Sequence, residues 1–396
     1  MPVKRMQQLG EVRSVIREQF DYGMKRKQEI GEDKVFDFSI GNPSVPPPPE
    51  VTAELVRLLT EADPLSLHGY TPATGDRAVR EAVAAQINAA HGTAFKAENL
   101  YMTVGAAASL SAVLSALVDR EEEVVLLAPY FPEYTVFVQT AGGVPVVVPC
   151  CEADFQPDFE KLAESITEKT RAIIINSPNN PSGAVLSEDT LRKIAALLTE
   201  KSAKYGKTIY LISDEPYREL VYDGVTVPFV TPFYPATVVC YSYSKSLSLP
   251  GERIGYVLVP SEMPDFAAVY AAVCGAGRAL GYVCAPSLFQ KILPYCGTLT
   301  ADRAVYARNR ELLYNSLTAM GYTAVRPDGA FYLFVKAMEE DANAFCEKAR
   351  KHELLLVPSD DFGIKGYVRI AYCVDTALIE RALPAFEALA KEYQHG

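Results

Sequence analysis

The chain has 396 residues, of which 49% are hydrophobic and 22% charged, so it is long enough for one large and one smaller domain. Its formal net charge of -11 argues against nucleic acid or an anionic membrane as a partner, because both are bound by basic patches. Small anionic ligands are not excluded, since they require only a local cluster of hydrogen-bond donors.

The N-terminal segment MPVKRMQQLGEVRSVIREQF is polar and helix-like, and it lacks the apolar stretch of a secretory signal. No window of the sequence is apolar over the length of a membrane span. The eight cysteines form no CxxC pair and the four histidines lie far apart, which indicates neither a disulfide framework nor a metal site. We therefore expect a reduced, cytoplasmic protein without a metal.

Residues up to about 45 contain a charged helical segment and then VFDFSIGNPSVPPPPE, whose proline run predicts an extended linker. From about residue 98, short apolar runs alternate with helical patterns. Seven runs read as strands: YMTV (101–104), EVVLLAP (123–129), VPVVVP (144–149), RAIIINSP (171–178), TIYLISDE (208–215), TVVCYSYS (237–244) and RIGYVLVP (253–260). Because they are continuously apolar, we predict a mainly parallel seven-stranded sheet flanked by helices.

The segment after residue 285 has a different pattern. It contains a long helical stretch (302–321), the strands AFYLFVKA (330–337) and LLLVP (354–358), and finally YVRIAYC (367–373) followed by a helix. This order predicts a smaller α+β domain formed by both termini, residues 1–45 and 286–396. The large domain, which contains the predicted seven-stranded sheet, would cover residues 46–285.

In α/β sheets, ligands bind beyond the carboxyl ends of the strands. The turn 105–108 (GAAA) follows the first run and opens a helix, where backbone N–H groups can approach an anion. Ser242 and Arg253 would complete a phosphate site, Arg253 by bidentate hydrogen bonds.

Two titratable groups follow later strands. Asp214, at a strand end, needs a cationic partner, and a pyridinium nitrogen would serve. Lys245, held among apolar strands beside a cation, would have a lowered pKa and be suited to forming a Schiff base. Together with the phosphate site, these groups are the parts needed to hold pyridoxal phosphate.

The segment SYSKSLSLPGERIG, with NNPSG, DEPY and YTPATG in the expected order, resembles the fold-type I pyridoxal-phosphate-dependent aminotransferases of class I/II (aspartate aminotransferase-like). The resemblance covers nearly the whole chain. It implies that Lys245 binds the cofactor covalently and later moves the proton between substrate and cofactor. Asp214 would keep the ring nitrogen protonated, while Asn180 and Tyr217 would hydrogen-bond the ring's phenolic oxygen.

The resemblance also assigns the remaining cofactor contacts. Phe131, rather than its neighbour Tyr130, would stack on the ring. Backbone N–H groups of the turn and nearby side chains would bind the phosphate, namely Gly105, Ala106, Ala107, Ser242, Ser244 and Arg253. Tyr70 matches a tyrosine that reaches the phosphate of a neighbouring subunit, which implies a homodimer with shared active sites.

For the substrate, the resemblance implies that Arg369 clamps the α-carboxylate and that Gly41 and Asn180 contact it. Ala107 stands where some bacterial relatives carry a lysine for a distal carboxylate. Arg278 lies in a segment that approaches the neighbouring active site in the family, and we hypothesise that it takes over this role; the alternative is a surface arginine near a helix end.

The implied reaction moves an amino group between an α-amino acid and a 2-oxo acid, with aspartate-like or broad specificity. A carbon–sulfur β-lyase would use the same lysine and aspartate, so this alternative stays open. An NAD(P)-linked oxidoreductase is disfavoured, because GAGRALG (275–281) follows an alanine-rich helical stretch rather than a strand. We interpret that segment as a helix break.

Overall fold

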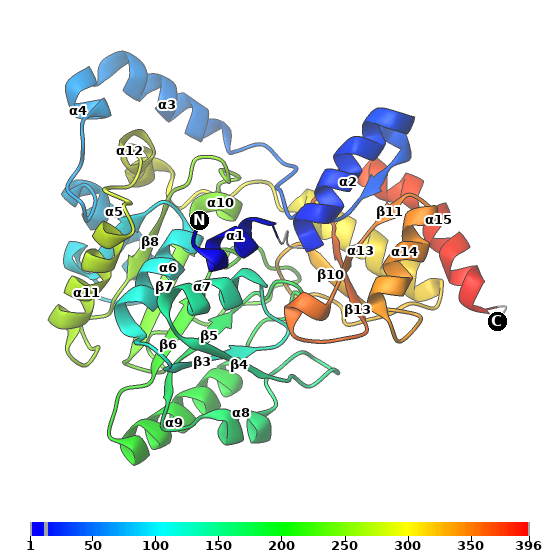
Figure 1. The fold of residues 1–396 in the computed structure, drawn as a ribbon. Coiled ribbons are helices and arrows are strands. Elements are labelled where there is room, and N and C mark those ends of the chain that lie inside the picture. The colour runs from blue at the N-terminus through cyan, green and yellow to red at the C-terminus, as the bar shows by residue number, and fades with distance from the viewer. Residues whose placement is uncertain (1, 12–14, 395–396) are drawn as a thin grey trace.

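A seven-stranded sheet forms the centre of the larger part of the molecule (Figure 1). The computed structural model describes residues 2–11 and 15–394. The strand order is β2–β8–β7–β6–β5–β3–β4; β8 is antiparallel to both neighbours, and the other pairs are parallel. The strands are β2 (Leu100–Thr103), β3 (Glu123–Leu127), β4 (Val144–Val148), β5 (Thr170–Asn176), β6 (Tyr210–Asp214), β7 (Thr237–Ser242) and β8 (Gly255–Leu258). The predicted mainly parallel sheet is confirmed.

Helices cover this sheet on both faces (Figure 1). Successive residues of β7 alternate between two hydrophobic cores, with Val238 and Cys240 in one and Val239 and Tyr241 in the other. The helices of this larger part, not all of which lie on the sheet, are α3 (Pro49–Glu61), α4 (Pro64–His68), α5 (Arg77–His91), α6 (Ala106–Leu117), α7 (Glu133–Ala141), α8 (Phe159–Ser165), α9 (Glu188–Tyr205), α10 (Tyr243–Ser246), α11 (Phe266–Ala279) and α12 (Ser287–Cys296), with the 3-10 turn η2 (Ala97–Asn99).

Helix α9 shows how local sequence sets these boundaries. The Ser187 side chain accepts a hydrogen bond from the Thr190 N–H at the start, and Gly206 ends the helix with a left-handed φ of 65°. A serine before the first turn and a glycine after the last are typical signals of helix ends.

The smaller part combines an antiparallel sheet with segments from both ends of the chain. Its order is β12 (Val357–Pro358), β13 (Tyr367–Ala371), β10 (Tyr332–Lys336) and β9 (Thr323–Ala324). Strand β1 (Phe36–Asp37) pairs with β11 (Leu354–Leu355) and so joins the N-terminal segment to the C-terminal one. The remaining elements are α2 (Val15–Ile30), η1 (Glu32–Lys34), α13 (Ala304–Ala319), α14 (Ala342–Lys351), η3 (Asp360–Phe362) and α15 (Thr376–Gln394).

The packing of two helices bears on the domain boundaries. The expected boundary at residues 285/286 assigns α12 to the small domain, but Ile292 and Leu293 of α12 lie in the core shared with α3 and α5. Helix α13, in contrast, packs against α15. We therefore propose that the boundary lies between α12 and α13. Helix α1 (Lys4–Glu11) lies over α7 of the large part (Figure 1), where the Arg5 Nη1 donates to the Gln139 carbonyl over 3.4 Å.

The GAGRALG segment is not a helix break as expected, because α11 continues through it to Ala279. A Cβ on Gly277 would lie 2.0 Å from the Tyr101 hydroxyl oxygen, so the glycine permits close packing of α11 on β2. No strand leads into this segment, which is inconsistent with a dinucleotide-binding loop. Across residues 2–11 and 15–394, none of the helices has the length and apolar character that crossing a bilayer requires.

Candidate active site

A cavity of about 280 Å³ opens beyond the carboxyl ends of the central strands, where side chains of both domains meet. Most of the residues singled out from the sequence line it. These are Gly41, Ala106, Ala107, Phe131, Asn180, Asp214, Tyr217, Ser242, Ser244, Lys245, Arg253 and Arg369. The convergence follows from the parallel strands, whose carboxyl ends share one edge of the sheet.

Asp214, the last residue of β6, is a buried carboxylate at the base of the cavity. Its Oδ2 accepts a 2.5 Å hydrogen bond from the Tyr134 hydroxyl, whereas its Oδ1 is buried without a partner. Burial raises the pKa of Asp214 to about 7, and the hydrogen bond from Tyr134 offsets part of this rise. A cationic N–H entering the cavity would satisfy the free oxygen, so this end of the site fits a pyridinium ring.

Lys245 projects from the short helix α10 that follows β7. Its Nζ donates a 2.6 Å hydrogen bond to the Gly41 carbonyl and lies 5.1 Å from the centre of the Phe331 ring. Burial lowers the pKa of Lys245 to about 8, and the positive charges of Arg253 and Arg369 act in the same direction. A large fraction of this amine is therefore unprotonated at mildly alkaline pH, as a nucleophile requires.

The end of the cavity that is rich in hydrogen-bond donors lies at the N-terminus of α6. Gly105 has a φ of 95°, and a Cβ there would meet the Arg253 Nη2 at 2.5 Å, so only glycine lets the guanidinium approach this turn. The Arg253 Nη1 is 3.3 Å from the Ser244 Oγ, which is 2.7 Å from the Ser242 Oγ. Two hydroxyls, a guanidinium and a helix N-terminus thus surround one volume, which suits a phosphate dianion.

Arg369 enters the opposite side of the cavity from β13. It is buried, its Nη1 donates to the Asn180 Oδ1 over 3.1 Å, and its Nη2 donates to the Ser39 carbonyl over 2.6 Å. Its Nε is buried without a partner, and desolvation lowers its pKa. A guanidinium held in place with an unused donor is well suited to binding a carboxylate.

Three of the expected site residues are not among those that line this cavity, and one of them is Gly105, which directly precedes the lining residue Ala106. The Tyr70 side chain is 90% exposed, and Arg278 is exposed near the end of α11. Neither is among the residues that line the cavity. Their expected roles therefore depend on a second subunit and stay predictions.

Sequence reasoning missed three residues of the site. The Tyr134 hydroxyl donates a hydrogen bond directly to the Asp214 Oδ2. Asn176 donates from Nδ2 to the Asp214 carbonyl and accepts from the Asn180 N–H, so it connects two of the expected residues. Tyr332 of β10 lines the cavity, with its hydroxyl 3.0 Å from that of Tyr217. Tyr134 lies three positions after the expected Phe131, in the first turn of α7.

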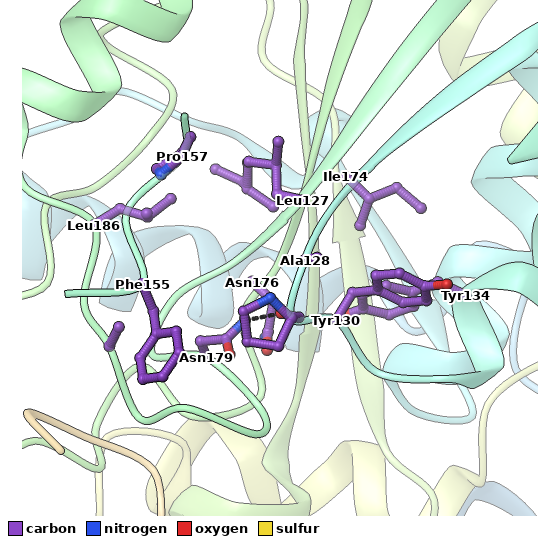
Figure 2. Close-up of a pocket in the computed structure, with 13 residues that line it drawn as sticks. Leu127, Ala128, Tyr130, Tyr134, Phe155, Pro157, Ile174, Asn176, Asn179 and Leu186 are labelled. Carbon is purple, nitrogen blue, oxygen red and sulfur yellow. Dashed lines mark hydrogen bonds between the residues drawn. The ribbon is translucent and has the colours of Figure 1, made fainter. Parts of the chain in front are cut away.

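A second cavity lies beside Tyr134, at the ends of β3 and β5 (Figure 2). Its volume of about 20 Å³ is enough for roughly one water molecule and is too small for a ring with a phosphate. The Asn179 side chain in its wall already donates to the Pro129 carbonyl over 3.1 Å (Figure 2). This cavity does not compete as the cofactor site.

The fold and this arrangement of lysine, aspartate and arginines are those expected of an aminotransferase, and the comparisons with known proteins agree. The chain belongs to the family "Aminotransferase class I and II", whose model matches residues 33–386 and whose members use pyridoxal phosphate. It is 33% identical over 336 residues to an aspartate/prephenate aminotransferase of Thermus thermophilus, covering 80% of this chain and 82% of that one. It is 31% identical over 393 residues to aromatic-amino-acid aminotransferase 2 of Thermococcus litoralis, covering 96% of each chain.

Solved structures agree with this family. A crystal structure of an aminotransferase from Eubacterium rectale has a TM-score of 0.97 at 57% identity and covers 99% of each chain. Aspartate aminotransferase from Thermus thermophilus with maleate has a TM-score of 0.85 at 28% identity, covering 98% of this chain and 100% of that one.

Proposed function

We propose that this aminotransferase binds pyridoxal phosphate in the 280 Å³ cavity, with Lys245 as its covalent attachment point. The observation that carries this proposal is the buried, unpartnered Oδ1 of Asp214 in the wall of a cavity that Lys245 also lines. An unpaired buried acceptor is costly unless a ligand completes it. A protonated ring nitrogen supplies both the missing hydrogen bond and the missing positive charge.

Each residue has a separate task in this proposal. When bound, the cofactor supplies an electron-accepting ring and carries the amino group between the two substrates. Asp214 keeps the ring nitrogen protonated, and Tyr134 in turn orients Asp214 through Oδ2. The Lys245 Nζ would take and return the proton of the substrate α-carbon. Phe131 packs on the ring, and Asn180 and Tyr217 hydrogen-bond its phenolic oxygen.

The anionic groups are held at the two ends of the cavity. We assign the phosphate to the α6 N-terminus at Ala106 and Ala107 together with Ser242, Ser244 and Arg253. Arg369, with the backbone of Gly41, binds the substrate α-carboxylate. This assignment would keep the two anions apart, with Lys245 in the wall of the same cavity.

We infer that the working form is a homodimer. The arm formed by α3 and α4 extends from the body of the large domain (Figure 1), and it exposes Leu65 and Tyr70, with 85% and 90% of these residues accessible. Large apolar side chains that are exposed to solvent close to one another are typical of an interaction surface. In a dimer, Tyr70 would reach the phosphate of the partner subunit.

For the amino donor, we propose aspartate-like or broad specificity. The relatives named above include aspartate, prephenate and aromatic-amino-acid aminotransferases. Ala107 lines the cavity and has no charge to bind the distal carboxylate of an acidic substrate. Binding of that carboxylate would therefore need the partner subunit's Arg278.

The covalent assignment is tested by reductive trapping. After incubation with pyridoxal phosphate and treatment with borohydride, we expect one cofactor per chain. Peptide mapping should locate it on Lys245, because this amine is the cavity lysine with a lowered pKa. A label on any other lysine would overturn the assignment.

The Arg278 hypothesis predicts a selective loss. In Arg278→Ala, kcat/KM for aspartate should fall about 10- to 100-fold, the size expected for one charge-assisted contact. The value for alanine as donor should stay within about twofold. Arg381→Ala, an exposed arginine of α15, is the matched control and should change neither. Equal losses for both donors would exclude a role in binding the side chain.

A further inference from the structure

Tyr332 is a cavity residue whose hydroxyl meets that of Tyr217. The two oxygens are 3.0 Å apart, both side chains are buried, and their rings pack edge to face with centres 5.8 Å apart. Tyr217 comes from the loop after β6 and Tyr332 from β10 of the small domain. This hydrogen bond therefore links the two domains inside the site.

The surroundings of Tyr332 hold it in place. The guanidinium carbon of Arg369 lies 4.6 Å from the centre of its ring, a cation–π contact. On the other side, a Cβ at position 41 would lie 1.9 Å from the Tyr332 hydroxyl oxygen, so this hydroxyl packs directly on Gly41. Tyr332 thus contacts Arg369, which we propose binds the substrate α-carboxylate. It also contacts Tyr217 and Gly41, whose carbonyl accepts a hydrogen bond from Lys245.

The direction of the hydrogen bond decides what Tyr217 can do. A phenol has one hydrogen to donate, so Tyr217 can donate into the cavity only if it accepts from Tyr332. Burial raises the pKa of Tyr332 to about 12, and the charge of Arg369 is the main influence that opposes this rise. Burial also raises the pKa of Tyr217, well above its usual range. The Arg369 cation against the Tyr332 ring makes the Tyr332 hydroxyl the better donor, which favours donation from Tyr332 to Tyr217.

We propose that Tyr332 is a positioning residue that donates to the Tyr217 oxygen and thereby directs the Tyr217 hydrogen to the phenolic oxygen of bound pyridoxal phosphate. This inference rests on the proposed function. A hydrogen bond to the phenolic oxygen stabilises its anion and so lowers the pKa of the linkage between cofactor and Lys245. Without Tyr332, Tyr217 is free to turn away, and part of this stabilisation is lost.

The test compares Tyr217→Phe, Tyr332→Phe and the double variant, each loaded with pyridoxal phosphate. The readout is the pH midpoint of the visible absorbance change of the bound cofactor, which is independent of turnover. We expect Tyr217→Phe to raise the midpoint by about 1 pH unit, as for loss of a hydrogen bond to a charged group. Tyr332→Phe should raise it by about half as much, and the double variant should match Tyr217→Phe alone.

Two further measurements separate positioning from packing. Phenylalanine keeps the ring against Arg369, so in Tyr332→Phe the KM for the amino donor should stay within about twofold while kcat falls. Tyr372→Phe is the matched control, because Tyr372 is equally buried but its hydroxyl donates to the Ala330 carbonyl outside the cavity. It should leave the midpoint unchanged.

The outcomes are distinguishable. An unshifted midpoint in Tyr332→Phe, or shifts that add in the double variant, would overturn this inference and leave the proposed function standing. A wild-type protein that acquires no visible absorbance with pyridoxal phosphate would overturn the proposed function and this inference with it.

Discussion

Replacing Lys245 with alanine is expected to lower kcat at least roughly 10⁴-fold, because one side chain provides both the covalent attachment and the proton transfer. Cofactor binding should remain measurable by equilibrium dialysis, since the phosphate end and Asp214 are intact. The matched control is Lys201→Ala, a part-buried lysine whose Nζ likewise donates to a backbone carbonyl, that of Ala163, over 2.7 Å. A Lys245→Ala protein with more than about a hundredth of wild-type turnover would contradict the proposed role.

The lowered pKa of Lys245 adds a pH dependence to the same experiment. Because burial brings this pKa to about 8, the fraction of free amine rises about tenfold per pH unit below that value. The initial rate at which cofactor-free protein attaches pyridoxal phosphate should therefore rise with pH and level off above about 8. A rate that keeps rising to about pH 10.5, the ordinary value for lysine, would show that the amine is not desolvated as described.

Replacing Asp214 with asparagine is expected to lower kcat by roughly 10³-fold, the scale of removing one preorganised electrostatic partner from a buried site. Asparagine keeps the size of the side chain but has no charge to hold the ring nitrogen protonated. Tyr134→Phe is the graded comparison: it removes the hydrogen bond to Oδ2 and leaves the carboxylate, so a loss of about tenfold is expected. Turnover of Asp214→Asn equal to that of Tyr134→Phe would contradict the pairing of Asp214 with the cofactor.

The same variant changes how stability depends on pH. Burial raises the pKa of Asp214 from 3.8 to about 7 in the cofactor-free protein, so between these values the folded chain holds a proton that the unfolded chain has released. The free energy of unfolding therefore falls as the pH rises from about 4 to about 7, by about 1.4 kcal/mol for each unit of pKa difference. Denaturant titrations of cofactor-free protein should show this decline, and Asp214→Asn should remove it. An identical decline in the variant would assign it to other groups.

Much of the fold was predictable because its signals are local. Continuous apolar runs indicated buried parallel strands, and a serine and a glycine marked the ends of α9. Asp214 and Lys245 could be brought together from the sequence alone, since each directly follows a strand and strand ends share one edge of the sheet. The antiparallel direction of β8, in contrast, depends on its pairing with β2 and β7, which no local pattern encodes.

Only the tertiary structure determined the contacts between segments that are distant in sequence. The packing of α12 against α3 and α5, rather than against the small domain, depends on which surfaces face one another in the folded chain. Tyr332 reaches Tyr217 across 115 positions, through the register of β10 and the closure of two domains. The sequence by itself indicated the lysine, the aspartate and the phosphate-binding arginine of the site and the sheet edge at which they gather. Their hydrogen-bond partners required the folded chain, because such contacts follow from packing geometry rather than from spacing along the chain.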